Sequence, residues 1–202
     1  MSLFGFLVET YRTERLKTLG VWSQIPDDRM RFRPEPRGRS PLEHMVHQCV
    51  SEEIWMKNML GIGISRPALP GQETRAAFIE HYAACSAERL EILAGQPDAW
   101  YGGNTTFFDV ERSRAWVLTR RLTHSAHHRG QLTVYLRLWG QALYSTYGPT
   151  ADTGGLFQNG AAVVYRYASI ADLLAQESNG GAAPALPSPG PAPLTERPSK
   201  GR

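Results

Sequence analysis

The sequence predicts an all-α protein, a four-helix bundle followed by a C-terminal loop and a disordered tail. Apolar residues recur with the 3.6-residue period of an amphipathic helix in four long segments, at about residues 3–22, 41–60, 72–94 and 110–139. Stretches rich in proline and glycine separate these segments and act as helix breakers. No series of alternating apolar and polar residues predicts a sheet, so helices joined by loops are the expected architecture.

The first helix is expected over about residues 3–22, where six residues approximate the helical period: Phe4, Leu7, Val8, Tyr11, Leu16 and Leu19. It must end before Pro26, because proline has no backbone N–H and its ring clashes with the preceding turn. Residues 26–39 then form a loop rich in proline and arginine.

The start of the second helix is the best-defined boundary, in the phrase SPLEHMVH. Ser40 can cap the free backbone N–H groups, and Pro41 suits the first helical position. Glu43, three residues after Ser40, completes a capping box. The helix is expected to continue to about Leu60 and to stop in GIGISRPALPG.

A third helix is expected over about residues 72–94, ending at Gly95 and Pro97. The connection DAWYGGNTTFF follows, in which Thr105 to Phe108 can be briefly extended. Asp109 is the expected cap of the longest helix, at about residues 110–139, which ends at Gly140.

The chain changes character after Gly140. Residues 141–167 contain turn residues, aromatic residues and the short β-prone AVVYRY, and they are expected to form an ordered loop. A brief helix, SIADLLAQE, follows with Ser169 as its cap. Residues 178–202 are crowded with proline, glycine and alanine and cannot compensate their ordering entropy. We therefore expect one folded domain over residues 1–177 and a disordered tail over 178–202.

Composition fits a globular protein without a membrane segment. The chain has 202 residues, 42% of them apolar and 20% charged, enough for one sizeable core. Charged residues such as Glu9 and Arg12 interrupt the segment where a signal peptide would be apolar. No run approaches the length of a membrane span, so a cytoplasmic location is expected. Cys49 and Cys85 have no paired spacing and are expected to be small buried apolar residues.

Three of the six histidines lie in the segment LTHSAHHRGQLTVYLRLWG, residues 122–140. His124 and His128 are four residues apart, which places both imidazoles on one helix face. A catalytic metal site needs about three protein ligands and an open position. The third ligand must come from another helix, and the candidates are His47, His44 and His81. His47 is preferred because it neighbours Val46 and Val50 on the core-facing second helix.

Other metal chemistries fit less well. A zincin would require a glutamate directly after His124, where the chain has Ser125. A di-iron bundle would need Glu-x-x-His in two helices, and the fourth helix has no glutamate beyond Glu111. The cysteines lack the spacing of a structural zinc site. The remaining options are a mononuclear site formed mainly by histidine and exposed or hydrogen-bonded histidines without a metal.

Two motifs resemble the DinB/YfiT-like family of metal-dependent proteins. HSAHHRGQ, from His124 to Gln131, is similar to the signature of the family's last helix, and SPLEHMVH resembles its second-helix motif. The resemblance covers about residues 3–140. It implies an up-down-down-up four-helix bundle and a homodimer. It also implies one divalent metal ion, nickel or zinc, on His47, His124 and His128.

Residues Arg129, Gly130 and Gln131 match the family's R-G-Q. Helix packing and polar support is one interpretation of these residues, a direct role in the site is the other, and the sequence leaves both open. A glycine within a helix costs about 1 kcal/mol against alanine, so close approach of another backbone is expected at Gly130.

Three functions remain open. By resemblance, the first is a metal-dependent thiol S-transferase or hydrolase that acts on a low-molecular-weight thiol or another small molecule. The second is a metal-binding, stress-related protein without turnover. The third and least favoured is nucleic-acid binding by the five arginines between Arg29 and Arg39. No catalytic residue is identified, although Glu52, Glu53, Tyr135 and Asp152 are conceivable.

Overall fold

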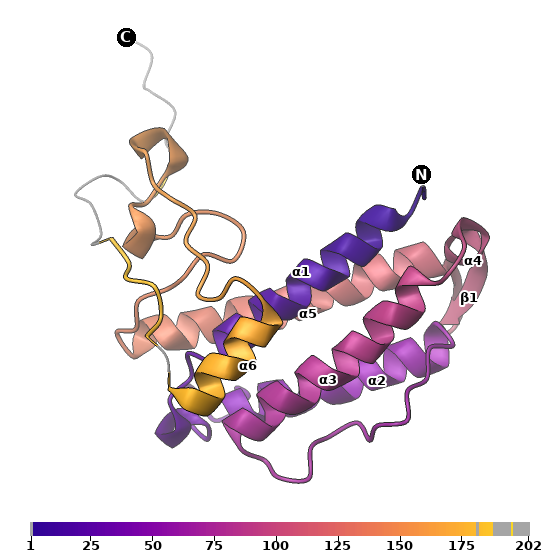
Figure 1. Cartoon of the computed structure of the whole chain (residues 1–202). Helices are drawn as coiled ribbons and strands as arrows, with labels where there is room; N and C mark the ends of the chain where they lie inside the picture. Colours follow the sequence, from indigo (N-terminus) through magenta and orange to yellow (C-terminus); the bar gives the residue numbers. More distant parts are fainter. Residues whose placement is uncertain (1, 181, 188–194, 196–202) are drawn as a thin grey trace. The chain divides into compact units, whose positions relative to one another are not determined.

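The structure is a computed structural model that describes residues 2–180, 182–187 and 195. Its contacts divide the chain into two compact units, Met1–Leu132 and Thr133–Arg202. The described residues are mostly helical (Figure 1), as the sequence predicts. In this part of the chain, no helix is long and apolar enough to cross a membrane.

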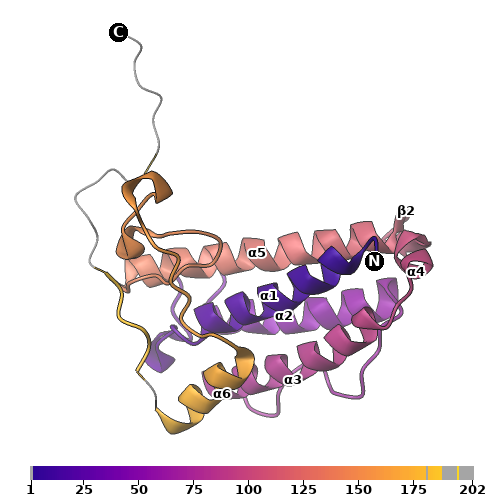
Figure 2. The same cartoon turned by 45° about the horizontal axis from the view of Figure 1, so that its top comes forward.

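The first unit contains the long helices. They are α1 (Gly5–Trp22), α2 (Pro41–Ile54), α3 (Arg75–Ala94) and the greater part of α5 (Arg114–Leu138). Short elements join them: the 3₁₀ turn η1 (Asp27–Arg29), the π-helical turn η2 (Trp55–Met59), helix α4 (Asp98–Gly102) and a hairpin of β1 (Asn104–Phe107) and β2 (Val110–Ser113). Figures 1 and 2 show α1 running along α3, and these two helices contact each other extensively.

Helix α2 begins as the sequence predicts. The Ser40 side chain accepts a hydrogen bond from the Glu43 backbone N–H, and the Glu43 carboxylate accepts one from the Ser40 backbone N–H at 2.8 Å. Both halves of the capping box are therefore present, with Pro41 at the first helical position. The helix runs to Ile54 and continues as the π-helical turn to Met59, so its end agrees with the expected one.

The start of α5 differs from the prediction. Asp109 was expected to cap the helix, but it lies in the turn between β1 and β2, and α5 begins only at Arg114. In the antiparallel hairpin Phe107 pairs with Val110 and Asn104 with Ser113. Residues 110–113 therefore pair with β1 instead of starting the helix, and the Ser113 hydroxyl accepts a hydrogen bond from the Trp116 backbone N–H at 3.2 Å.

The core of the first unit is apolar and is built by α1, α3 and α5 together with the π-helical turn that follows α2. One cluster of buried residues comprises Leu7, Tyr11, Trp55, Met56, Met59, Leu60, Ile62, Leu90, Leu93, Tyr101, Val117, Leu118 and Leu122. Both cysteines are free and buried, as expected. Burial raises the pKa of the Cys49 thiol, so it stays protonated and unreactive at neutral pH.

In the second unit, the predicted ordered loop contains two 3₁₀ turns, η3 (Ala151–Thr153) and η4 (Phe157–Asn159), and AVVYRY forms no strand. Helix α6 (Ile170–Asn179) follows, and Ser169 caps it as predicted by accepting a hydrogen bond from the Asp172 N–H. Most of the predicted tail, residues 178–202, lies outside the described residues.

Candidate metal centre

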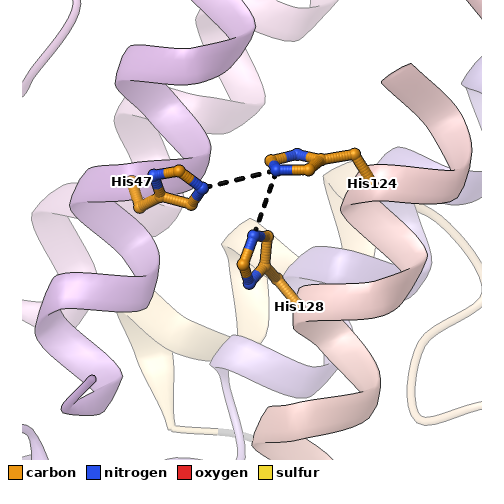
Figure 3. Close-up of side chains that lie close together, drawn as sticks. All are labelled: His47, His124 and His128. Carbon is orange, nitrogen blue, oxygen red and sulfur yellow. Dashed lines mark hydrogen bonds between the residues drawn. The ribbon is translucent and has the colours of Figure 1, made fainter. Parts of the chain in front are cut away.

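Three histidines from two helices converge in the first unit. His47 lies on α2, and His124 and His128 lie one turn apart on α5, as Figure 3 shows. One ring nitrogen from each residue lies within 4.8 Å of the others. The Nε2 atom of His124 is 3.4 Å from Nε2 of His47 and 3.2 Å from Nε2 of His128. Three imidazole nitrogens that face one point could hold a metal ion.

Hydrogen bonds on the far side of the rings assign the tautomers of two histidines. Nδ1 of His128 lies 2.8 Å from Oε1 of Gln131, so His128 donates its Nδ1 proton there and directs the lone pair of Nε2 into the cluster. Nδ1 of His124 lies 2.9 Å from Nη1 of Arg121. A guanidinium can only donate, so in the metal-free protein His124 carries its proton on Nε2, between the other two rings, and a metal ion bound at this nitrogen would displace that proton.

The electrostatic environment keeps these imidazoles neutral. Burial, and secondly the charge of Arg121, lower the pKa of His124 to about 3. Burial lowers the pKa of His128 to about 4, and burial followed by the charge of Arg39 also lowers the pKa of His47. All three imidazoles are therefore uncharged at neutral pH. This is the form of histidine that binds metal ions, through an unprotonated ring nitrogen. The chemistry of this donor set fits a divalent ion.

Acidification should therefore destabilise the metal-free protein. Unfolded histidines bind a proton near pH 6.5, whereas folded His124 and His128 bind one only near pH 3 and 4. The unfolded state consequently binds more protons between these values, and the free energy of unfolding should fall as the pH drops from about 6.5 to 4. Urea unfolding in a chelator at several pH values measures this fall. A free energy that stays constant over this range would contradict it, and His128→Gln should reduce the slope.

A buried polar network holds Arg121, the residue that contacts His124, in place. Arg121, 1% exposed, donates hydrogen bonds to the Ser51 hydroxyl at 2.8 Å and to the Gln48 carbonyl at 3.3 Å. It also pairs with the Glu52 carboxylate at 3.4 Å. The guanidinium that contacts His124 is thus fixed by three groups of α2, which ties the histidine on α5 to the helix that carries His47.

Glu52 is the centre of this network and is 1% exposed. Its carboxylate accepts hydrogen bonds from the hydroxyls of Tyr11 at 2.7 Å and Tyr82 at 2.9 Å, and it pairs with Arg89 at 3.4 Å as well as with Arg121. Burial alone would raise its pKa, but the charges of Arg121 and Arg89, together with the hydrogen bonds from Tyr11 and Tyr82, lower it below its ordinary value. Glu52 is therefore an ionised structural group whose acceptor positions are occupied, and it does not fit the role of a general base.

The other conceivable catalytic residues also have structural partners. Glu53 pairs with Arg89 at 2.5 Å. In the second unit, Asp152 pairs with Arg137 at 2.6 Å and accepts a hydrogen bond from the Leu143 N–H at 2.7 Å, which holds the loop 141–167 together. The ring of Tyr135 packs near Trp139, with 6.2 Å between the ring centroids.

The remaining histidines lie outside the three-residue group. His44 is buried, and its ring centroid is 5.3 Å from that of His128. Burial, and secondly the charge of His128, lower its pKa to about 4. His127 is exposed, and His81 contacts the Cys85 thiol at 3.4 Å. Of the candidate third ligands that the sequence offers, the structure brings His47 to the pair.

Two residues of the R-G-Q segment have separate roles. Arg129 is buried and donates to the Glu14 carboxylate at 2.5 Å and to the Thr18 hydroxyl at 3.1 Å, which joins α5 to α1. Gln131 orients His128. The expectation that another backbone approaches Gly130 closely is wrong, because a Cβ added there would meet nothing within 4 Å.

Three of the five arginines of the basic segment form ion pairs, while Arg31 and Arg39 are exposed. Arg33 pairs with Glu43, Arg37 with Glu35 at 3.0 Å, and Arg29 with Asp28 at 3.7 Å. These ion pairs favour a solvated loop over a surface for phosphate contacts.

Sequence reasoning missed one neighbour of the cluster. The ring of Trp55 stacks on that of His124, with 5.4 Å between centroids, and Arg121 lies over the same indole at 5.8 Å. The position of Arg121 three residues before His124 puts both on one helix face, so its place follows from the sequence. Trp55 could not be found in this way, because its approach depends on how α2 and α5 pack.

Comparison with known proteins gives a consistent result. The model of the DinB family matches residues 1–155. A DinB-like protein from Bacillus cereus ATCC 10987 has a similar crystal structure, with a TM-score of 0.62 and 17% identity, covering 70% of this chain and 95% of that one. A DinB-like protein from Bacillus subtilis gives 0.54 and 15%, covering 68% and 94%. At such identities these two structures show a shared fold. A search of curated proteins gives no match.

Proposed function

The chain belongs to the DinB family, and we propose that it binds one divalent metal ion, nickel or zinc, through His47, His124 and His128. The observation that carries the proposal is the approach of three imidazole nitrogens within 4.8 Å of one another. We further propose the up-down-down-up four-helix arrangement and a homodimer.

The residues around the cluster support a preorganised site. Arg121 fixes the ring of His124 and Gln131 fixes that of His128, so little side-chain entropy is lost when a metal ion binds, and His124 releases its Nε2 proton in that step. His47 and His124 are only partly buried, which leaves the cluster accessible from solvent. A metal ion with an open position supplies a Lewis acid that lowers the pKa of a bound water or thiol.

We propose that the protein is a metal-dependent enzyme of thiol S-transferase or hydrolase type that acts on a low-molecular-weight thiol or another small molecule. The three histidines and the solvent-accessible side of their cluster support this reading. The alternative is a non-catalytic metal-binding protein related to stress. The environment of Glu52 favours this alternative. Its carboxylate oxygens already have hydrogen-bond and ion-pair partners, so Glu52 is not available as a general base.

Elemental analysis of protein purified without a nickel column tests the metal proposal. We expect one equivalent of a divalent metal per chain in the wild type and a strongly reduced content in His47→Ala. His127→Ala is the matched control, because His127 is an exposed histidine next to the cluster. Equal metal content in all three proteins would refute the proposed ligand set.

An assay with a panel of thiols and one electrophile separates the two functions. Metal-dependent conjugation in the wild type, abolished in His47→Ala, supports the enzyme. Inactivity across the panel with the metal retained supports the binding protein.

A further inference from the structure

A continuous set of aromatic side chains leads from the three-histidine cluster to the surface of the hairpin. We call it the aromatic strip, and it comprises Trp55, Phe107, Phe108 and Trp116. Trp55 lies in the π-helical turn after α2, Phe107 ends β1, Phe108 is in the hairpin turn and Trp116 lies in the first turn of α5. The strip thus combines residues from three segments of the first unit.

The ring contacts connect each member to the next. Trp55 stacks on His124, with 5.4 Å between centroids and 26° between ring planes. From Trp55 the centroid distances are 5.1 Å to Phe107 and 6.4 Å to Phe108. Phe107 is 5.1 Å from Trp116. His124 and Phe108 therefore both lie beside one indole ring, within reach of a single aryl-alkyl molecule.

The strip changes from buried to exposed along its length. Trp55 is 9% exposed, whereas Trp116 is 41% and Phe108 69% exposed. Burial in the core therefore does not explain the outer half of the strip. An aromatic side chain that remains in water gains its hydrophobic free energy only when a partner covers it.

Phe108 lies in the hairpin turn with a strained backbone conformation. Its φ angle is +56°, and it has the only positive φ of a non-glycine residue in the part of the chain that is described. Bulky residues rarely adopt this conformation, which asparagine or glycine would occupy at lower cost. Backbone strain of this kind is concentrated at functional sites, so an exposed phenylalanine here points to a ligand-binding role.

The base of the hairpin is anchored next to the cluster. The Thr105 hydroxyl donates a hydrogen bond to the Met59 carbonyl at 2.5 Å, which attaches β1 to the π-helical turn that carries Trp55. Turns of this type are frequent at functional sites. Ile54, the residue before Trp55, is 44% exposed and lies seven residues after His47, on the same face of α2.

From these contacts we propose that the aromatic strip binds the aryl group of a small molecule whose polar end reaches the three-histidine centre. The inference rests on the proposed metal-binding function and names the substrate class of that site as aryl or aryl-alkyl compounds. Trp55 forms the inner wall beside His124, and Phe108 and Trp116 cover the outer end of the aryl group. A second copy of this chain is the competing occupant.

The test uses the full chain loaded with zinc and two hydroxamates that share one metal-binding group. Acetohydroxamate carries only a methyl group, whereas 4-phenylbutanehydroxamate adds an aryl-alkyl group. Calorimetry should show that the wild type binds the aryl compound at least about tenfold more tightly. Phe108→Asn should remove most of this preference while leaving the affinity for acetohydroxamate unchanged. Asparagine tolerates positive φ, so this variant should fold.

Phe6→Asn is the matched control, because Phe6 is an exposed phenylalanine of α1 outside the strip, and it should keep the preference. Equal affinities of zinc-loaded wild type for the two compounds would overturn the aromatic strip and leave metal binding intact. Failure of the wild type to take up zinc would instead refute the proposed function. Sedimentation of each variant detects the competing occupant: a dimer lost in Phe108→Asn, with the aryl preference unchanged, would assign the strip to contact between copies.

Discussion

Glu52→Ala is expected to lower the free energy of unfolding by about 3–5 kcal/mol, the range for removal of one partner from a buried ion pair. The carboxylate pairs with two arginines, and each of the three side chains is at most 2% exposed. Without Glu52, Arg121 and the two tyrosine hydroxyls lose an acceptor, and Arg89 loses one of its two carboxylate partners among the described residues. Urea unfolding of the metal-free protein measures the loss.

Glu52→Gln separates charge from packing in this prediction, because glutamine has nearly the same shape and keeps one acceptor oxygen. We expect it to recover only part of the lost stability, since two buried guanidinium groups still lack a counter-charge. If Glu52→Ala does not fold, the comparison of Glu52→Gln with the wild type carries the test. A loss below about 1 kcal/mol in both variants would show that the network is stabilised in another way.

His124→Ala should abolish the stabilisation of the protein by zinc. An ion that binds only the folded state stabilises it by about 2.7 kcal/mol at a concentration one hundred times its Kd. Nε2 of His124 lies 3.4 Å from Nε2 of His47 and 3.2 Å from Nε2 of His128, so its removal leaves only two of the three proposed ligands. Thermal unfolding with and without zinc measures the difference.

In that experiment, wild type and His127→Ala should gain the same stability from zinc. His127 precedes His128 on α5 but is exposed and does not belong to the converging group. An equal zinc-dependent increase in His124→Ala would assign the metal to other residues. Loss of the increase in His127→Ala would also contradict the ligand set.

Features determined by neighbouring residues could be predicted from the sequence. The capping box of Ser40 and Glu43 depends on side chains three residues apart, and the structure contains both of its hydrogen bonds. The pairing of His124 and His128 depends on one helical turn. His47 was preferred over His44 and His81 from its apolar neighbours, and the structure places it with the pair. Whether these residues bind a metal stays a prediction.

Features that depend on packing between distant segments could not be predicted. The hairpin before α5 was missed because four-residue strands give too short a pattern to distinguish from a loop. Glu52 looked like a possible base, and only the structure shows four partners around it. No backbone of the described residues approaches Gly130 closely, so the prediction that packing requires a glycine at this position is wrong.

The two buried arginines of α5 have a mechanical consequence for the cluster. Arg121 lies three residues before His124, and Arg129 lies directly after His128. Arg121 is bound to α2 through Glu52, and Arg129 is bound to α1 through Glu14. If α5 slid by one turn, about 5.4 Å, both guanidinium groups would leave their carboxylates within the protein interior. The pairs therefore set the longitudinal register of α5, so that the heights of His124 and His128 relative to His47 are fixed from both ends.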